Sequence, residues 1–153
     1  AIALLGCAFH AVYWPDSSHI ENLGDTMPTG QSGDESRAQG INNNALTQVV
    51  GWNITANRAV QWIKQPGGGW SVFDLTSTIS SSSCTLVGGI KLWQAHAVND
   101  NGWIIAWGQQ NQSPNDFYAV LLTPLAYSNC PADINQDGFC ACNIVCHDYS
   151  CAF

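Results

Sequence analysis

Apolar residues in this chain come in short runs, and the spacing of three or four residues that marks an amphipathic helix is almost absent. The runs are rich in β-branched and aromatic residues, and clusters of Asn, Gly, Pro and Ser separate them. Both features are typical of β-strands joined by turns. The pattern therefore predicts an all-β fold. The expected strands are Ile2–Cys7, Ala8–Trp14, Ile20–Leu23, Ala38–Asn42, Gln48–Asn53, Ala59–Lys64, Ser71–Leu75, Thr85–Val87, Lys91–Val98, Trp103–Trp107, Tyr118–Thr123 and Ala126–Ser128.

Two sequence phrases recur, and both indicate a repeated structural unit. The first phrase is Arg37–Asn44 followed by Gln48–Trp52, which returns as Gln94–Asn101 followed by Gly102–Trp107. The second phrase occurs as His10–Trp14, Arg58–Trp62 and Tyr118–Leu122. A unit of this kind cannot bury its apolar face alone, so the copies are expected to pack on one another.

The central copy contains four expected antiparallel strands between about Arg37 and Leu75, which is the content of one propeller blade or one meander. The first copy supplies its last two strands and an extra N-terminal strand, and the last copy supplies three. One complete and two partial units are too few to close a propeller. We therefore expect an incomplete propeller or a sandwich over residues 1–128, followed by a short Cys-rich appendage over 129–153.

Charge and length exclude several functions. The chain has four basic and eleven acidic residues and a formal net charge of −7. No basic stripe exists to neutralise phosphates, so a nucleic-acid partner is not expected. No stretch is long and apolar enough to span a membrane. No nucleophile elbow, phosphate-binding loop or metalloprotease motif occurs, and we expect no enzymatic activity.

The seven cysteines indicate an oxidising compartment, so the protein is expected to be secreted and extracellular. An odd count leaves at least one thiol free, bound to a metal or paired with another chain. Cys84 and Cys130 bracket the last repeat and form the disulfide that we expect first. The other candidates for disulfides are Cys7, Cys140, Cys142, Cys146 and Cys151, of which the last four, with His147, have zinc binding as an alternative. Glycosylation sequons begin at Asn53 and Asn111.

The order Ala-x-Gly-Ile-Asn-Asn, Val-Val-Gly-Trp and x-Ala-Val-x-Trp between Ala38 and Trp62 resembles the HAF-type extracellular repeats. These repeats occur in secreted bacterial proteins, notably of planctomycetes and of proteins with PEP-CTERM sorting signals. The resemblance covers about residues 8–125. It implies a secreted, repeat-built β protein with no established catalytic residues.

The segment from Asp133 to Gly138 has the form Asp-x-Asn-x-Asp-Gly, which is the first half of a calcium loop. Asp133, Asn135 and Asp137 would supply side-chain oxygens, and Phe139 would supply its carbonyl. The segment resembles dockerin-type calcium loops, which makes Ca²⁺ the candidate cofactor. Ile144 stands where such a loop has an acidic residue, and an Asx-rich turn is the alternative.

These features lead to two hypotheses for function. The first is a structural protein that self-assembles into an extracellular filament or surface layer, with Ala1–Trp14 and Pro124–Phe153 as contact segments, through edge-strand pairing and disulfides. The alternative is a monomeric binding module for a polysaccharide or a protein partner. Trp70, Trp93 and Trp103 fall outside the repeated tryptophan positions and are the candidates for stacking on sugars.

Overall fold

The computed structural model describes residues 9–24, 35–79, 89–110, 113–124 and 143–146, and all statements on structure concern these residues. Their regular elements are all strands, so the prediction of an all-β fold is confirmed. The strands are β1 (Val12–Asp16), β2 (His19–Asn22), β3 (Ser36–Ile41), β4 (Gln48–Asn53), β5 (Arg58–Lys64), β6 (Trp70–Asp74), β7 (Ile90–Val98), β8 (Ile104–Gln110), β9 (Ser113–Thr123) and β10 (Asn143–Cys146).

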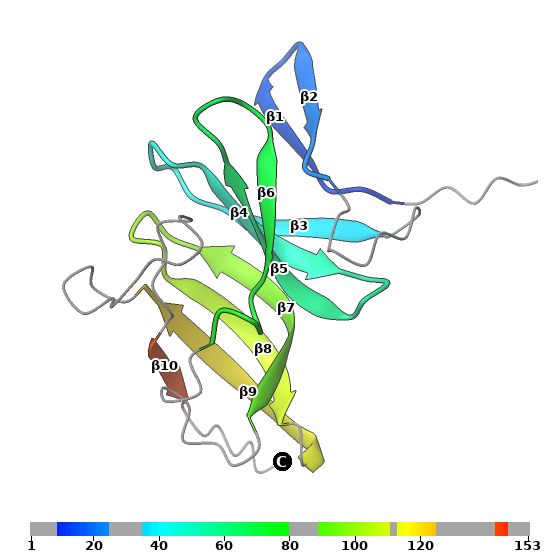
Figure 1. Cartoon of the computed structure of the whole chain (residues 1–153), viewed down its shortest axis with the longest axis vertical. Coiled ribbons are helices and arrows are strands. Elements are labelled where there is room, and N and C mark those ends of the chain that lie inside the picture. Colours follow the sequence, from blue (N-terminus) through cyan, green and yellow to red (C-terminus); the bar gives the residue numbers. More distant parts are fainter. Residues whose placement is uncertain (1–8, 25–34, 80–88, 111–112, 125–142, 147–153) are drawn as a thin grey trace, which may run out of the picture.

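The strands form three antiparallel units that follow one another along the chain (Figure 1). The first unit is the hairpin β1–β2. The second unit is the four-stranded meander β3-β4-β5-β6, and the third unit is the meander β7-β8-β9-β10. The blade-like, four-stranded repeat expected from the sequence is therefore present.

The third unit has one strand more than the sequence predicted. The sequence predicts three strands there, but β10 pairs with β9 as a fourth, with Ile144 opposite Leu122. This strand comes from the segment assigned to the Cys-rich appendage. The expected strands Ile2–Cys7, Thr85–Val87 and Ala126–Ser128 lie outside the described residues.

The units repeat in register as well as in sequence. Trp52 lies opposite Ala59 in the second unit, and Trp107 lies opposite Ala119 in the third. The first strand of each four-stranded unit also carries a β-bulge at the same repeat position, with Gln39 as the extra residue in β3 and His96 in β7. A bulge bends a strand and increases its twist. Equal bulges therefore give β3 and β7 the same local shape.

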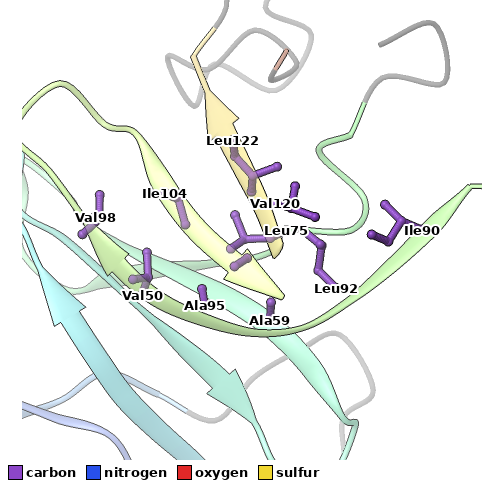
Figure 2. Close-up of a cluster of buried hydrophobic side chains, with 11 residues drawn as sticks. Val50, Ala59, Leu75, Ile90, Leu92, Ala95, Val98, Ile104, Val120 and Leu122 are labelled. Carbon is purple, nitrogen blue, oxygen red and sulfur yellow. The ribbon is translucent and has the colours of Figure 1, made fainter. Parts of the chain in front are cut away.

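The second unit is buried on both of its faces. Val49 and Val50 are consecutive, so their side chains point to opposite faces of the sheet. Val49 belongs to a core cluster shared with the first unit, and Val50 to a cluster shared with the third. Figure 2 shows the second of these clusters, in which side chains of β4, β5, β7, β8 and β9 meet. The units therefore stack in chain order, as neighbouring propeller blades do.

The backbones of β3 and β7 approach closely at Gly40. A Cβ atom at this residue would lie 2.8 Å from the Cα of Ala97 and 3.0 Å from the carbonyl oxygen of His96. Such contacts leave no room for a side chain. The glycine therefore allows the second and third units to pack at this separation.

Candidate functional site

The third unit has a face that no other described element covers. The side chains of β8 alternate in burial: Ile104 and Ala106 are buried in the core, while Ile105 between them is 53% exposed. Alternation places Trp103 and Trp107 on the same side as Ile105. We call this surface the outer face. Its residues are Trp103, Ile105, Trp107, Ala119 and Leu121.

The same positions of the second unit are covered. Val50 and Ala59 are both 0% exposed, because the third unit packs on them. Their equivalents in the third unit are Ile105 and Ala119, and both are exposed. The second unit therefore has an apolar face on which the next unit packs. The equivalent face of the third unit is exposed.

Aromatic rings strengthen the apolar character of the outer face. The ring of Trp107 lies 5.6 Å from that of Trp93 and 5.3 Å from that of Phe117, measured between centroids. The rings of Trp93 and Phe117 meet edge to face at 5.8 Å. The cluster joins β7, β8 and β9, so it stiffens the face across three strands.

The opposite end of the stack carries a second apolar surface that no other described residue covers. In the second unit, Val60, Trp62 and Val72 pack against the first unit. The same three positions in the first unit are held by Val12, Trp14 and Ile20. Trp14 is 60% exposed and Ile20 is 64% exposed. We call these three residues the first face.

A cleft of about 340 Å³ lies between β1 and β3. It is lined by Val12–Trp14 of β1, Ala38–Ile41 of β3 and Val49 of β4. The lining is mostly apolar, and the cleft is open to solvent.

Polar contacts hold the first unit to the second. The Lys64 ammonium donates a hydrogen bond to Glu21 Oε1, and the Trp70 indole N–H donates to Oε2, both at 2.9 Å. Lys64 lies over the rings of Tyr13 and Trp70, which meet edge to face at 5.3 Å. The hydrogen bond from Lys64, with a further one from Trp70, lowers the pKa of the Glu21 carboxyl. Sequence reasoning missed this cluster, because Glu21 and Lys64 are 43 residues apart.

An exposed turn brings Asp16, Ser18 and His19 together. The hydroxyl and the backbone amide of Ser18 both donate to Asp16, and His19 Nδ1 lies 3.0 Å from its Oδ2. These hydrogen bonds, with those of Ser18 the largest contributors, lower the pKa of Asp16 to about 2. The backbone amide of Ser18, two residues after Asp16, donates to the Asp16 carboxylate, which is the geometry of an Asx turn.

The structure places the three candidate sugar-stacking residues differently. Trp70 is half-buried between Tyr13 and Lys64, and Trp93 belongs to the aromatic cluster. Trp103 is 46% exposed on the outer face. The sequon residue Asn53 is buried in β4, where its side-chain oxygen accepts a hydrogen bond from the Ala56 amide.

The remaining candidates lie outside the described residues, except for Cys146, whose backbone is part of β10. They are the sequon Asn111, the calcium-loop residues Asp133, Asn135, Asp137 and Phe139, and the cysteines Cys7, Cys84, Cys130, Cys140, Cys142 and Cys151.

Within the described ranges, no three His, Cys, Asp or Glu side chains gather as a metal site would require. Those ranges also contain no helix that could cross a membrane. The repeat alignment identifies the residues of the outer face and the first face. Which copies of these residues are exposed follows only from the burial of each unit in the structure.

No family model, curated protein or solved structure matches this chain, so the resemblance to HAF-type repeats stays a hypothesis.

Proposed function

We propose that this chain is a secreted structural protein whose copies associate head to tail, with the outer face of one copy covering the first face of the next. The observation that carries the proposal is the difference between Ala59 and Ala119. These residues hold one repeat position, and the first is fully buried while the second is exposed.

The contact between copies would repeat contacts that exist inside the chain. In the second unit, Val60 and Trp62 are buried against Ala11 and Leu23 of the first unit. The first face offers the same positions as Val60 and Trp62, and the outer face offers the same position as Ala11, namely Ala119. One copy therefore carries both surfaces of a contact that already occurs between its first and second units.

A contact between two different faces is heterologous, and unless its rotation closes a ring it continues from copy to copy. This supports the filament or surface layer over a closed pair. Disulfides through cysteines outside the described residues would then lock neighbouring copies together, and Ca²⁺ would bind the loop at Asp133–Asp137. Both remain parts of the proposal.

The gain from burying apolar side chains and the entropy lost on association together predict a weak contact between copies, which needs a high local concentration. Burying a large apolar side chain such as Trp14, Ile20 or Ile105 stabilises by about 1.5–3 kcal/mol. Association loses about 4–15 kcal/mol of translational and rotational freedom. Little free energy is left after this cost, so association is expected only at high local concentration. A net charge of −7 on each copy adds repulsion, so salt that screens it should strengthen association.

Sedimentation velocity over a series of protein concentrations tests the proposal. The unmodified chain should shift to larger species as concentration rises, and Ile105→Lys on the outer face should remain monomeric. Leu46→Lys is the matched control, because Leu46 is an exposed aliphatic residue in the turn after β3 and belongs to neither face. A chain that stays monomeric at the highest concentration, or an equal effect of both variants, would overturn the proposal.

Trp103 supports the alternative of a polysaccharide-binding module, since its ring is exposed beside Ile105. Such a module would retain a soluble glycan on the monomeric Ile105→Lys chain and lose it on Trp103→Ala. Titration with glycan by fluorescence separates this function from self-association.

A further inference from the structure

The cleft beside β1 borders on the face of the second unit that packs against the first unit. Ile41 lies opposite Val49 in the pairing of β3 with β4, so the two side chains share one face of the sheet. Val49 packs in the core cluster with the first unit and is 3% exposed, whereas Ile41 is 51% exposed. Both residues line the cleft, together with Val12–Trp14. The first unit therefore covers one part of this face and leaves the part around Ile41 exposed.

The third unit shows how the equivalent part of its own face is covered. Ile41 and Val49 correspond to Val98 and Ile104. These two residues are 8% and 2% exposed, and Val50 of β4 packs in the same core cluster. Figure 2 shows Val50 beside Val98. Between the second and third units, strand β4 therefore covers this position with an aliphatic side chain.

Within the described residues, β1 has no neighbour that corresponds to β4. β1 and β5 are equivalent strands, but β5 lies between β4 and β6, whereas β1 pairs with β2 alone. The register on the paired edge is the same in both units. The Leu23 amide donates to the Ala11 carbonyl at 3.0 Å, and the Leu75 amide donates to its equivalent, Ala59, at the same distance. Backbone groups alternate in direction along an antiparallel strand, so Val12 directs its N–H and C=O groups away from β2.

The lining of the cleft favours an uncharged occupant. It consists of aliphatic, aromatic and small residues, with the Gln39 amide as the polar side chain apart from the Tyr13 hydroxyl. A charged group would lose its hydration there without gaining a partner. An extended peptide fits this chemistry, because its backbone can pair with the edge of β1 and an aliphatic side chain can cover Ile41.

We propose that the cleft binds an extended, uncharged peptide segment of another protein, with an aliphatic side chain at the position that Val50 holds in β4. The peptide pairs with β1 at Val12 and covers Ile41, which is recognition by β-augmentation. A second copy of this chain is a poorer donor, because each of its described strands already belongs to a sheet that would have to enter with it.

NMR titration of the full chain with a synthetic peptide tests this site. The peptide has the sequence of residues 47–53, Thr-Gln-Val-Val-Gly-Trp-Asn, and the control peptide carries Val50→Asp. The chain carries Ile105→Lys throughout, so the result does not depend on whether copies associate through the outer face. The matched chain variants are Ile41→Lys, which places a charge in the cleft, and Leu46→Lys, which places the same charge in an exposed turn outside it.

The amide signal of Val12 should shift when the peptide is added, and that of Val60 in β5 should not. Val50→Asp in the peptide and Ile41→Lys in the chain should each weaken binding by about tenfold or more, because each places a charge in an apolar site. Leu46→Lys should leave the affinity within about twofold of the parent.

Three results would overturn the proposal. The first is no shift of the Val12 amide at about 1 mM peptide. The second is a shift centred on Val60, because the peptide would then replace β4 beside β5, or an equal effect of Ile41→Lys and Leu46→Lys. The third is a shift of the Val12 amide when the chain alone is concentrated, because the occupant would then be a second copy.

Discussion

The Asp100 carboxylate accepts a hydrogen bond of 2.6 Å from the backbone amide of Asn43, which holds the same position in the preceding unit. The Asn44 side-chain amide also donates to the Asp100 carbonyl, at 2.9 Å. These residues lie in the turns after β3 and β7. The turn of one unit is therefore fastened to the equivalent turn of the next, which sets the lateral register of the stack.

Asp100→Ala should loosen this contact, because it removes the acceptor for the Asn43 amide. The turn is exposed, so we expect a loss of no more than about 1 kcal/mol in the free energy of unfolding. Urea denaturation measures this loss. Asp100→Asn keeps an acceptor oxygen and should lose less. Equal losses for the two variants would show that the acceptor oxygen is not what matters.

Gly40→Ala should weaken the packing of the third unit on the second. The new methyl group would meet the backbone of Ala97 and His96 at 2.8 and 3.0 Å, and overpacking of this kind costs about 1–3 kcal/mol. Gly67→Ala is the control, since a Cβ there meets nothing within 4 Å. Thermal unfolding of both variants compares them. A Gly40→Ala chain as stable as the Gly67→Ala chain would contradict the close approach.

The contact of Glu21 with Lys64 should make stability depend on pH. The pKa of Glu21 is lowered in the folded chain, so the ionised carboxyl stabilises the fold above its ordinary pKa of 4.5. This contribution is lost as the pH falls through the folded pKa. Glu21→Gln should therefore be less stable than the parent at about pH 6 and should approach it at about pH 3. Urea midpoints at the two pH values provide the measurement, and a difference that grows toward low pH would contradict the sign.

The sequence predicted much of the fold, because the strand pattern and the repeated phrases carry local information. Val49–Trp52 and Ile104–Trp107 show their strands through alternation and their equivalence through spacing. β10 was missed, since Asn143–Cys146 offers only two aliphatic residues inside a Cys-rich segment. Its place beside β9 depends on a contact with a distant part of the chain.

The candidate surfaces were harder to predict than the strands. Whether Ile105 or Trp14 is covered depends on which units stack, and the residue types are the same in covered and uncovered copies. The sequence therefore identified repeat positions but not their burial. The partners of Glu21 were out of reach for a similar reason, because Lys64 and Trp70 come from the neighbouring unit.

The most direct test of the proposed assembly mixes two variants, each with one end blocked. Ile105→Lys blocks the outer face and Ile20→Lys blocks the first face, and both residues are exposed, so both chains should fold. In sedimentation velocity, each variant alone should remain monomeric at concentrations where the unmodified chain associates. The equimolar mixture should form a dimer and nothing larger, because one intact outer face meets one intact first face. Association of Ile20→Lys alone, or a mixture that stays monomeric while the unmodified chain assembles, would contradict head-to-tail stacking.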